Sequence, residues 1–314
     1  MTSTTSDHNS ADDPIATLLT TYSELNPSRV DELTAIPTPL EFMRYVAKNR
    51  PFIVRDAAED WPAVRDWSAA HLLQTLGSHP VNVSVTPFGN ADALAQTPSG
   101  GTLFVEPHEQ TEPFDKFLNY VRTQAANQNP GNRTPRGNIK YAQTQNDNLR
   151  SEYSHLFTSI PSSVTFVDEA LEQEPDAINF WLGNSHSTTA LHKDNYENIY
   201  VQVRGEKHFT LLPPLAEACV NERMTGTARY VPVFVGSEEL EIRPNGAEVP
   251  DIPVAMWDPA DPGVNATPYS QLAKGLVLQA KLKQGDLLYL PALWYHRVAQ
   301  GEGEEGFSCS VNYW

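Results

Sequence analysis

Hydrophobic residues near the start of the chain recur at helical spacing in two segments. The first segment begins after Asp13-Pro14 and stops at Asn26-Pro27, and its apolar positions are Ile15, Leu18, Leu19, Tyr22 and Leu25. Proline is favoured in the first turn of a helix and excluded from its interior, so both ends of this helix are marked. A second helix is predicted over residues 39–47. We therefore expect residues 1–35 to form a polar N-terminus and an amphipathic helix.

The second half of the chain has a different pattern, made of short apolar runs between turn signals. Turns are expected at Arg204-Gly205-Glu206 and Gln284-Gly285-Asp286. Strands are predicted over 178–182, 199–203, 208–212, 230–235, 275–281, 286–290 and 307–313, with two earlier ones over 51–55 and 81–85. Many short strands at such spacing indicate a β-barrel or double sheet. Loops are expected over 125–138 and, as a long irregular insertion, over 243–269.

Composition and charge narrow the function classes. The chain has 314 residues, of which 40% are hydrophobic, enough for a sizeable core. Its 22 basic and 39 acidic residues give a net charge of −17, which argues against binding to duplex DNA and suits a basic partner. Cys219 and Cys309 form no pairing pattern, and residues 1–13 lack the features of a secretory signal. We expect a reducing compartment, cytoplasmic or nuclear, and no membrane association.

One constellation carries candidate chemistry. In an extended segment His192 and Asp194 would point to the same face, and His296 follows a later strand. Two histidines and one carboxylate on one side of an ion form the facial triad of non-haem Fe(II) oxygenases, which leaves three positions open. Lys207 lies on the strand predicted after His192 and could hold the distal carboxylate of 2-oxoglutarate.

The chain resembles the Jumonji-C (JmjC) 2-oxoglutarate- and Fe(II)-dependent oxygenases, in particular lysyl 3-hydroxylases that act on developmentally regulated GTP-binding proteins. The matching stretches include Asn49-Arg-Pro-Phe-Ile-Val-Arg55, Leu191-His-Lys-Asp194, Gly205-Glu-Lys-His-Phe209 and Gly285-Asp-Leu-Leu-Tyr-Leu-Pro-Ala-Leu-Trp-Tyr-His296. They run from about residue 36 to the end of the sequence. The resemblance implies a mostly β fold, a double-stranded β-helix (jelly-roll, cupin-like) with N-terminal helical decoration. Residues 36–314 would be a single oxygenase domain with its motif core at about 176–314.

The resemblance also implies roles for individual residues. His192, Asp194 and His296 match the iron ligands, and Lys207 with Thr189 matches the contacts to the distal carboxylate of 2-oxoglutarate.

Three further residues match less direct positions around the same site, and Tyr200 is a candidate because it lies two residues beyond one of them. Asn198 and Asn312 correspond to polar residues near the chelating end of the co-substrate, and Tyr141 to a tyrosine that caps its pocket. Tyr200 either contacts the prime substrate or packs in the barrel.

The implied activity is hydroxylation of a protein, at C-3 of a lysine in a GTP-binding protein, with Fe(II), 2-oxoglutarate and O2 as cofactors and release of succinate and CO2. The partner would be a basic, lysine-containing segment, not a nucleic acid. Three alternatives stay open at this point: an N-methyl-lysine demethylase, a non-catalytic JmjC scaffold and a non-oxygenase cupin. Relatives often continue into C-terminal helices used for dimerisation, whereas the sequence stops at Trp314. The sequence therefore reads as naturally short or truncated, and a homodimer stays open.

The charge yields a testable expectation. If the field of the −17 charge steers a basic peptide, raising the ionic strength from about 0.05 to about 0.3 M should raise the KM for that peptide several-fold. The KM for 2-oxoglutarate, measured in the same steady-state assays, should change much less. If both KM values depended equally on salt, the negative charge would not steer the peptide and would matter only for solubility.

Overall fold

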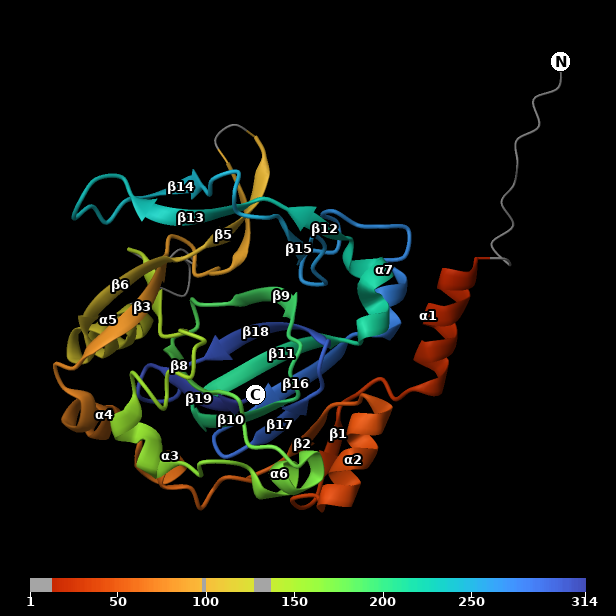
Figure 1. Ribbon diagram of the computed structural model, residues 1–314, viewed down its shortest axis with the longest axis horizontal. Helices are drawn as coiled ribbons and strands as arrows, with labels where there is room; N and C mark the ends of the chain where they lie inside the picture. Colours follow the sequence, from red (N-terminus) through yellow and green to blue (C-terminus); the bar gives the residue numbers. More distant parts are fainter. Residues whose placement is uncertain (1–12, 98–99, 127–136) are drawn as a thin grey trace.

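Two β-sheets lie face to face at the centre of the molecule (Figure 1). The computed structural model describes residues 13–97, 100–126 and 137–314. The larger sheet contains, in spatial order, β1 (Asp31–Leu33), β2 (Phe52–Val54), β17 (Leu287–Leu290), β10 (Asn198–Arg204), β19 (Ser308–Tyr313) and β8 (Ile178–Gly183). The smaller sheet contains β16 (Leu278–Leu282), β11 (Glu206–Leu212), β18 (Tyr295–Gly301) and β9 (Thr189–Lys193). Within β8–β11, and again within β16–β19, successive strands alternate between the two sheets, which is the jelly-roll arrangement expected from the sequence.

The larger sheet is buried on both faces. Alternate residues of its strands point to the helices on one side and to the smaller sheet on the other. Ile199, Val201 and Val203 of β10 pack in an apolar cluster with the helices outside the sheet, which we call the outer core. Tyr200 points instead into the space between the two sheets, the barrel interior. The helices are α1 (Pro14–Leu25), α2 (Pro39–Lys48), α3 (Pro62–Asp66), α4 (Ala69–Leu76), α5 (Phe114–Ala126), α6 (Thr165–Leu171) and α7 (Glu217–Val220), with 3-10 turns η2 (Ser154–Ser159), η3 (Pro214–Ala216) and η4 (Leu272–Gly275).

The N-terminal segment is joined to the core sheet by pairing and by charge. β2 lies antiparallel to β17 and parallel to β1, so it continues the larger sheet. Arg55 follows β2 and forms ion pairs with the buried Asp286 at 2.6 Å and with the exposed Glu32 at 2.5 Å. Asp286 also accepts a hydrogen bond from the backbone N–H of Lys283, so its charge is compensated inside the predicted turn.

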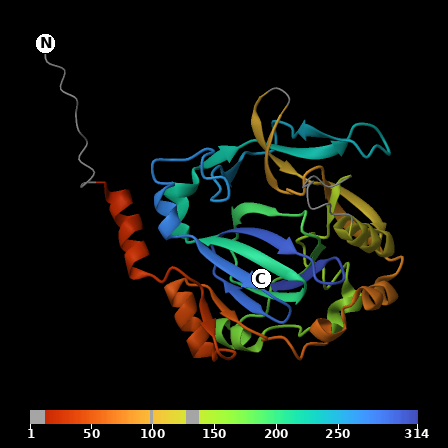
Figure 2. The same ribbon diagram turned by 180° about the vertical axis from the view of Figure 1, so that it is seen from behind.

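Three smaller sheets form a second layer around the barrel, two above it and one, with β3 and β6, at its side (Figures 1 and 2). One joins β6 (His108–Pro113), β3 (Pro80–Thr86) and β7 (Ile139–Tyr141); another joins β14 (Leu240–Pro244), β13 (Thr227–Pro232), β5 (Thr102–Glu106) and β4 (Ala93–Gln96); the third pairs β12 (Glu222–Thr225) with β15 (Ile252–Ala255). Periodicity did not reveal most of these strands, because they are short and carry many polar residues.

Three sequence-based boundaries were wrong. The strand predicted over 230–235 ends at Pro232, and Val233 to Val235 are exposed at the hairpin tip. The strand predicted over 275–281 begins only at Leu278, because the chain first completes the turn η4. The insertion predicted to be irregular contains β15, which finds its partner in β12. Most of the predicted loop 125–138 lies outside the described residues.

The turn between β10 and β11 requires its glycine. Gly205 has φ +67°, in the left-handed region, and a Cβ built on it would lie 2.6 Å from the carbonyl oxygen of Gly301. A side chain would therefore clash with a fixed backbone atom in addition to its conformational strain. This glycine allows β11 to turn directly back over the barrel from β10.

The two cysteines lie on α7 and β19. Cys219 and Cys309 are both buried and unpaired. Among the described residues, no helix combines the length and the apolar character needed to cross a bilayer.

Packing in the outer core predicts a large effect of one substitution. Phe180 on β8 is fully buried, with its ring centroid 4.5 Å from that of Tyr153 and 5.8 Å from that of Trp67. Phe180→Ala should lower the free energy of unfolding by about 3–5 kcal/mol, because it leaves a cavity among rigid aromatic rings. Urea denaturation measures this loss. The matched variant Phe88→Ala removes a ring that is 75% exposed and should change stability by about 0.5 kcal/mol or less. Similar losses for both variants would contradict this assignment of the core.

Candidate metal centre and adjoining cavity

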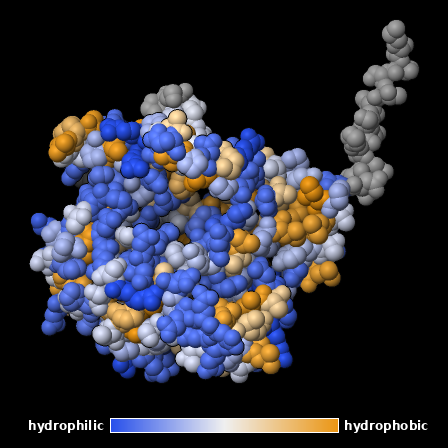
Figure 3. All heavy atoms as spheres, in the orientation of Figure 1, coloured by the Kyte–Doolittle hydropathy of each residue, from blue (hydrophilic) through white to orange (hydrophobic). Residues whose placement is uncertain are grey.

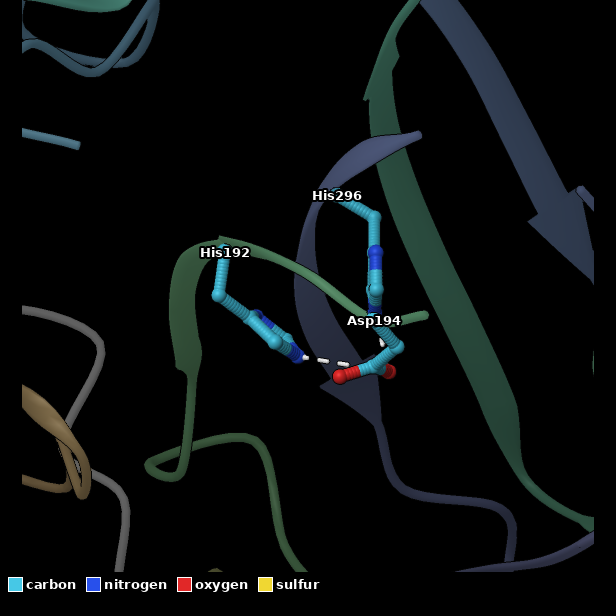
Figure 4. Close-up of side chains that lie close together, drawn as sticks. All are labelled: His192, Asp194 and His296. Atoms are coloured by element: carbon cyan, nitrogen blue, oxygen red, sulfur yellow. Dashed lines mark ion pairs between the residues drawn. The ribbon is translucent and has the colours of Figure 1, made fainter. Parts of the chain in front are cut away.

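Strand pairing brings the three predicted metal ligands together. His192 on β9 and His296 on β18 are direct partners in the antiparallel ladder, so their side chains face the same side. Their ring centroids lie 4.1 Å apart. Asp194 follows β9 immediately and turns its carboxylate toward both rings (Figure 4). One ligand atom from each residue lies within 4.8 Å of the others, and this is the one such group found among the described residues.

Backbone carbonyls orient the two imidazoles. Nδ1 of His192 donates to the carbonyl oxygen of Ala190 at 2.8 Å, and Nδ1 of His296 donates to that of Trp294 at 3.0 Å. Each Nε2 therefore faces Asp194 Oδ2, at 3.9 Å from His192 and 3.5 Å from His296, and in a neutral imidazole it is the nitrogen free to bind metal. Cis ligands of an octahedral ion lie about 3 Å apart, so a small inward movement would complete a divalent metal site. The donor set and its support fit Fe(II).

The charges of His192 and Asp194 suit metal binding. Removal from water and the neighbouring His296 lower the pKa of His192, which keeps its imidazole neutral. Burial raises the pKa of Asp194, but the adjacent His296 and His192 outweigh this effect, and the pKa of Asp194 lies below its usual value. At neutral pH His192 is therefore neutral and Asp194 ionised, the forms that bind metal.

Lys207 occupies the barrel interior without a negative partner. Its side chain is 2% exposed, and its Nζ donates to the hydroxyl of Tyr141 at 2.8 Å. No carboxylate of the described residues forms an ion pair with it. A buried cation without an anion is costly, so the interior around Lys207 fits a ligand that brings a carboxylate. The Tyr141 hydroxyl beside it could donate to the same group.

The two predicted asparagines form one polar chain. The amide of Asn312 donates to Asn198 at 3.1 Å, and its carbonyl oxygen accepts from the indole N–H of Trp181 at 2.7 Å. Both asparagines are buried on the inner face of the larger sheet, where β10 and β19 pair. The structure thus places Asn198 and Asn312 together, opposite the sheet that carries His192.

Thr189 and Tyr200 have the less determined positions. Thr189 on β9 and Phe209 on β11 flank the same residue of β18, and Phe209 is two residues from Lys207. Thr189 also lines the cavity beside His192. Tyr200 is 6% exposed, and its hydroxyl is 2.6 Å from Ser310 Oγ. Its ring packs edge-on against Phe209. This surrounding favours packing over contact with the prime substrate, which stays untested.

A cavity of about 850 Å³ opens beside the candidate metal centre. His192 and Thr189 form its floor, and β5, β6 and β13 of the second layer contribute its walls. Figure 3 shows mostly hydrophilic residues over this face, between the barrel and the second layer. A second cavity of about 390 Å³ continues past His192 toward β12 and β15.

Sequence reasoning missed the acidic residues of this cavity. Asp92, Glu106 and Glu109 line it together with Gln143. Their segments are separated along the chain and show no common spacing, so only folding relates them. Gln143 lies two residues after Tyr141, and that closeness was the one available signal.

Burial of Lys207 predicts a pH dependence of stability. Burial lowers the pKa of Lys207 from its ordinary value of 10.5 to about 7. Between these values the unfolded chain binds more protons than the folded chain, so this residue makes stability rise with pH. Lys207→Met removes that contribution. In urea unfolding of the metal-free protein, the wild type should gain free energy of unfolding relative to Lys207→Met between pH 7 and pH 9.

The control is Lys116→Met, which removes an exposed lysine on α5. It should follow the wild type at both pH values. If Lys207→Met also followed the wild type, Lys207 would not be desolvated in solution.

Comparison with known proteins places the chain among relatives that share the whole domain. The model of the cupin-like domain family matches residues 37–314. The chain is 38% identical to the human protein named bifunctional peptidase and (3S)-lysyl hydroxylase JMJD7, over 92% of this chain and 84% of the relative. It is 31% identical to lysine-specific demethylase JMJ32 of Arabidopsis thaliana, over 91% and 81%, and 34% identical to JmjC domain-containing protein E of Dictyostelium discoideum, over 88% and 81%.

The fold, the grouping of two histidines with one aspartate and these similarities lead to the same assignment. The chain belongs to the cupin-like JmjC family of 2-oxoglutarate-dependent oxygenases.

Proposed function

We propose that this protein is an Fe(II)- and 2-oxoglutarate-dependent hydroxylase that acts on C-3 of a lysine in a protein, in particular a GTP-binding protein. The observation that carries the oxygenase part is the arrangement of the barrel interior. The group formed by His192, Asp194 and His296 lies on the same barrel as Lys207, a buried cation without an anionic partner in the described part of the chain. The lysyl part rests on the similarity to a relative named as a (3S)-lysyl hydroxylase.

Different residues of this chain would bind the metal and the co-substrate. His192, Asp194 and His296 would hold Fe(II), while Lys207 and Tyr141 would bind the distal carboxylate of 2-oxoglutarate, with Thr189 as a further contact. Iron and co-substrate together supply hydroxylation of a C–H bond by O2, coupled to conversion of 2-oxoglutarate into succinate and CO2.

The polar chain and the apolar walls would complete the co-substrate site. Asn198 and Asn312 would hold its chelating end, since Trp181 fixes the amide of Asn312, which in turn donates to that of Asn198. Phe209 and Leu211 line the interior on β11 and keep water from it. A dry interior strengthens the attraction between Lys207 and a carboxylate.

The domain limits, partner and compartment follow from the same proposal. Residues 36–314 would act as one oxygenase domain with the motif core at about 176–314, and residues 1–35 would form its N-terminal extension. Support comes from the family match over 37–314 and from β2, which extends the core sheet beyond β17. The partner would be a basic protein segment in the cytoplasm or nucleus, where Cys219 and Cys309 would stay reduced. A homodimer is compatible with this proposal.

Reconstitution under anaerobic conditions tests the activity. The protein is loaded with Fe(II) and 2-oxoglutarate, mixed with lysine peptides from a proteome digest and exposed to air. Mass spectrometry should detect peptides heavier by one oxygen atom, with fragment ions that place it on the lysine side chain, and succinate should form in step with them. His192→Ala should abolish both products and weaken Fe(II) binding while keeping the fold, because this ligand contributes little to the core.

The matched control is His208→Ala, because His208 lies on β11 with its side chain 47% exposed and pairs with Glu206 outside the barrel. It should retain turnover. Formaldehyde release from methylated lysine peptides would favour demethylation, the activity in the name of the Arabidopsis relative. Absence of oxygenated peptide, formaldehyde and succinate from the wild type would overturn the oxygenase proposal in favour of a scaffold.

A further inference from the structure

Asp92 stands where the two cavities beside the candidate metal centre meet. It precedes β4 directly and lines both the cavity of about 850 Å³ and the one of about 390 Å³. His192 and Phe104 also line both cavities. A side chain that enters either cavity therefore meets a wall to which both Asp92 and the metal-centre residue His192 contribute.

Among the described residues, no ion pair is found for two acids of these cavities, Asp92 and Glu109, and Glu109 accepts a hydrogen bond from the hydroxyl of Ser84 at 2.6 Å. The other acids are paired. Glu106 lies 3.8 Å from Arg229, Glu222 lies 2.8 Å from Lys193 and Asp258 lies 3.4 Å from Arg297. Each of these three carboxylates thus has a basic partner.

The one hydrogen bond found for Asp92 within the described residues comes from a neutral group. The amide Nε2 of Gln143 donates to Asp92 Oδ2 at 2.9 Å, and Gln143 is itself 7% exposed. Burial raises the pKa of Asp92 to about 6, the Gln143 hydrogen bond opposes this, and Glu106 and Glu109 add to it. A carboxylate of this kind gains most from a cation supplied by a ligand.

The surroundings of Asp92 suit a long side chain with a terminal charge. Phe104 offers an apolar surface to methylene groups, and Glu106 and Glu109 add negative potential at the cavity wall. A lysine has a four-carbon stem and an ammonium with three donors, so it can pack along Phe104 and donate to the free lone pairs of Asp92. Gln143 holds one carboxylate oxygen and so positions the other.

We propose that Asp92 binds the ε-ammonium group of the substrate lysine and thereby selects lysine over uncharged side chains, with Gln143 as its positioning residue. This inference rests on the proposed lysyl hydroxylation and names the residue that recognises the target side chain. In this arrangement the ammonium is held at one end of the side chain, while the carbons nearer the backbone are left free to lie at the metal centre.

Two small probes test the inference without turnover. Nα-acetyl-lysine methylamide and its norleucine analogue differ in the ammonium group, and their binding to the oxygen-free protein loaded with Mn(II) and 2-oxoglutarate is followed by ligand-observed NMR. The wild type should bind the lysine probe about 10- to 100-fold more tightly than the norleucine probe, as expected for a charge-assisted hydrogen bond. Asp92→Asn keeps the shape and the contact with Gln143, and it should reduce this ratio to about twofold or less with norleucine binding unchanged.

Asp60→Asn is the matched control, because Asp60 is an exposed aspartate outside both cavities. It should keep the wild-type ratio, which separates a local contact from the loss of one unit of net charge. Thermal unfolding of each variant verifies that the fold is intact. A wild type that binds both probes equally well would overturn the inference, even if Asp92→Asn failed to fold. A folded Asp92→Asn that still prefers the lysine probe would also overturn it.

Hydroxylation assays separate this inference from the proposed function. For a lysine peptide that the wild type oxygenates, Asp92→Asn should raise KM about 10- to 100-fold, with a smaller effect on kcat. Probe preference that depends on Asp92, without oxygenation of any peptide, would refute the proposed function and keep Asp92 as a lysine contact. If the protein oxygenates a lysine peptide but wild type and Asp92→Asn bind the lysine probe equally well, the proposed function would stand and the role of Asp92 would be refuted.

Discussion

The antiparallel pairing of β9 with β18 sets His192 directly opposite His296, and the rest of the structure has to accommodate that pair. Paired residues in such a ladder face the same side, so the register that joins the two histidines also commits their neighbours. A shift by one residue would turn His296 out of the barrel. The chain secures this register through β11, which pairs with β18 along its whole length and carries Lys207 on the inner face.

An interior built this way costs stability. Lys207, Asn198 and Asn312 are all buried between the sheets, where polar groups are favourable only if they are satisfied. The asparagines satisfy one another and Trp181, whereas Lys207 has a hydroxyl but no anion among the described residues. The outer core offsets this deficit with apolar and aromatic packing on the opposite face of the larger sheet. The outer face of the larger sheet thus contributes stability, whereas its inner face contributes polar groups for ligand binding.

Much of the fold was readable from local patterns, and the reasons lie in particular residues. Pro14 and Pro39 mark the starts of two helices, and Thr38 with Glu41 forms the capping box that fixes the second. Gly205 marks the turn that reverses the chain between two core strands. The strands of the second layer escaped prediction because they are short, polar and held by partners distant in sequence. β15, for example, gains its structure only by pairing with β12.

The sequence by itself determined the residue types of the metal centre and the lysine inside the barrel, because each belongs to a short motif that is continuous in the chain. It also determined the acidic character of the molecule, which depends on composition alone. Only the tertiary structure decided which acid borders the metal centre. Asp92, Gln143 and His192 come from three separate segments, and long-range strand packing, which leaves no periodic trace along the chain, brings them to one cavity.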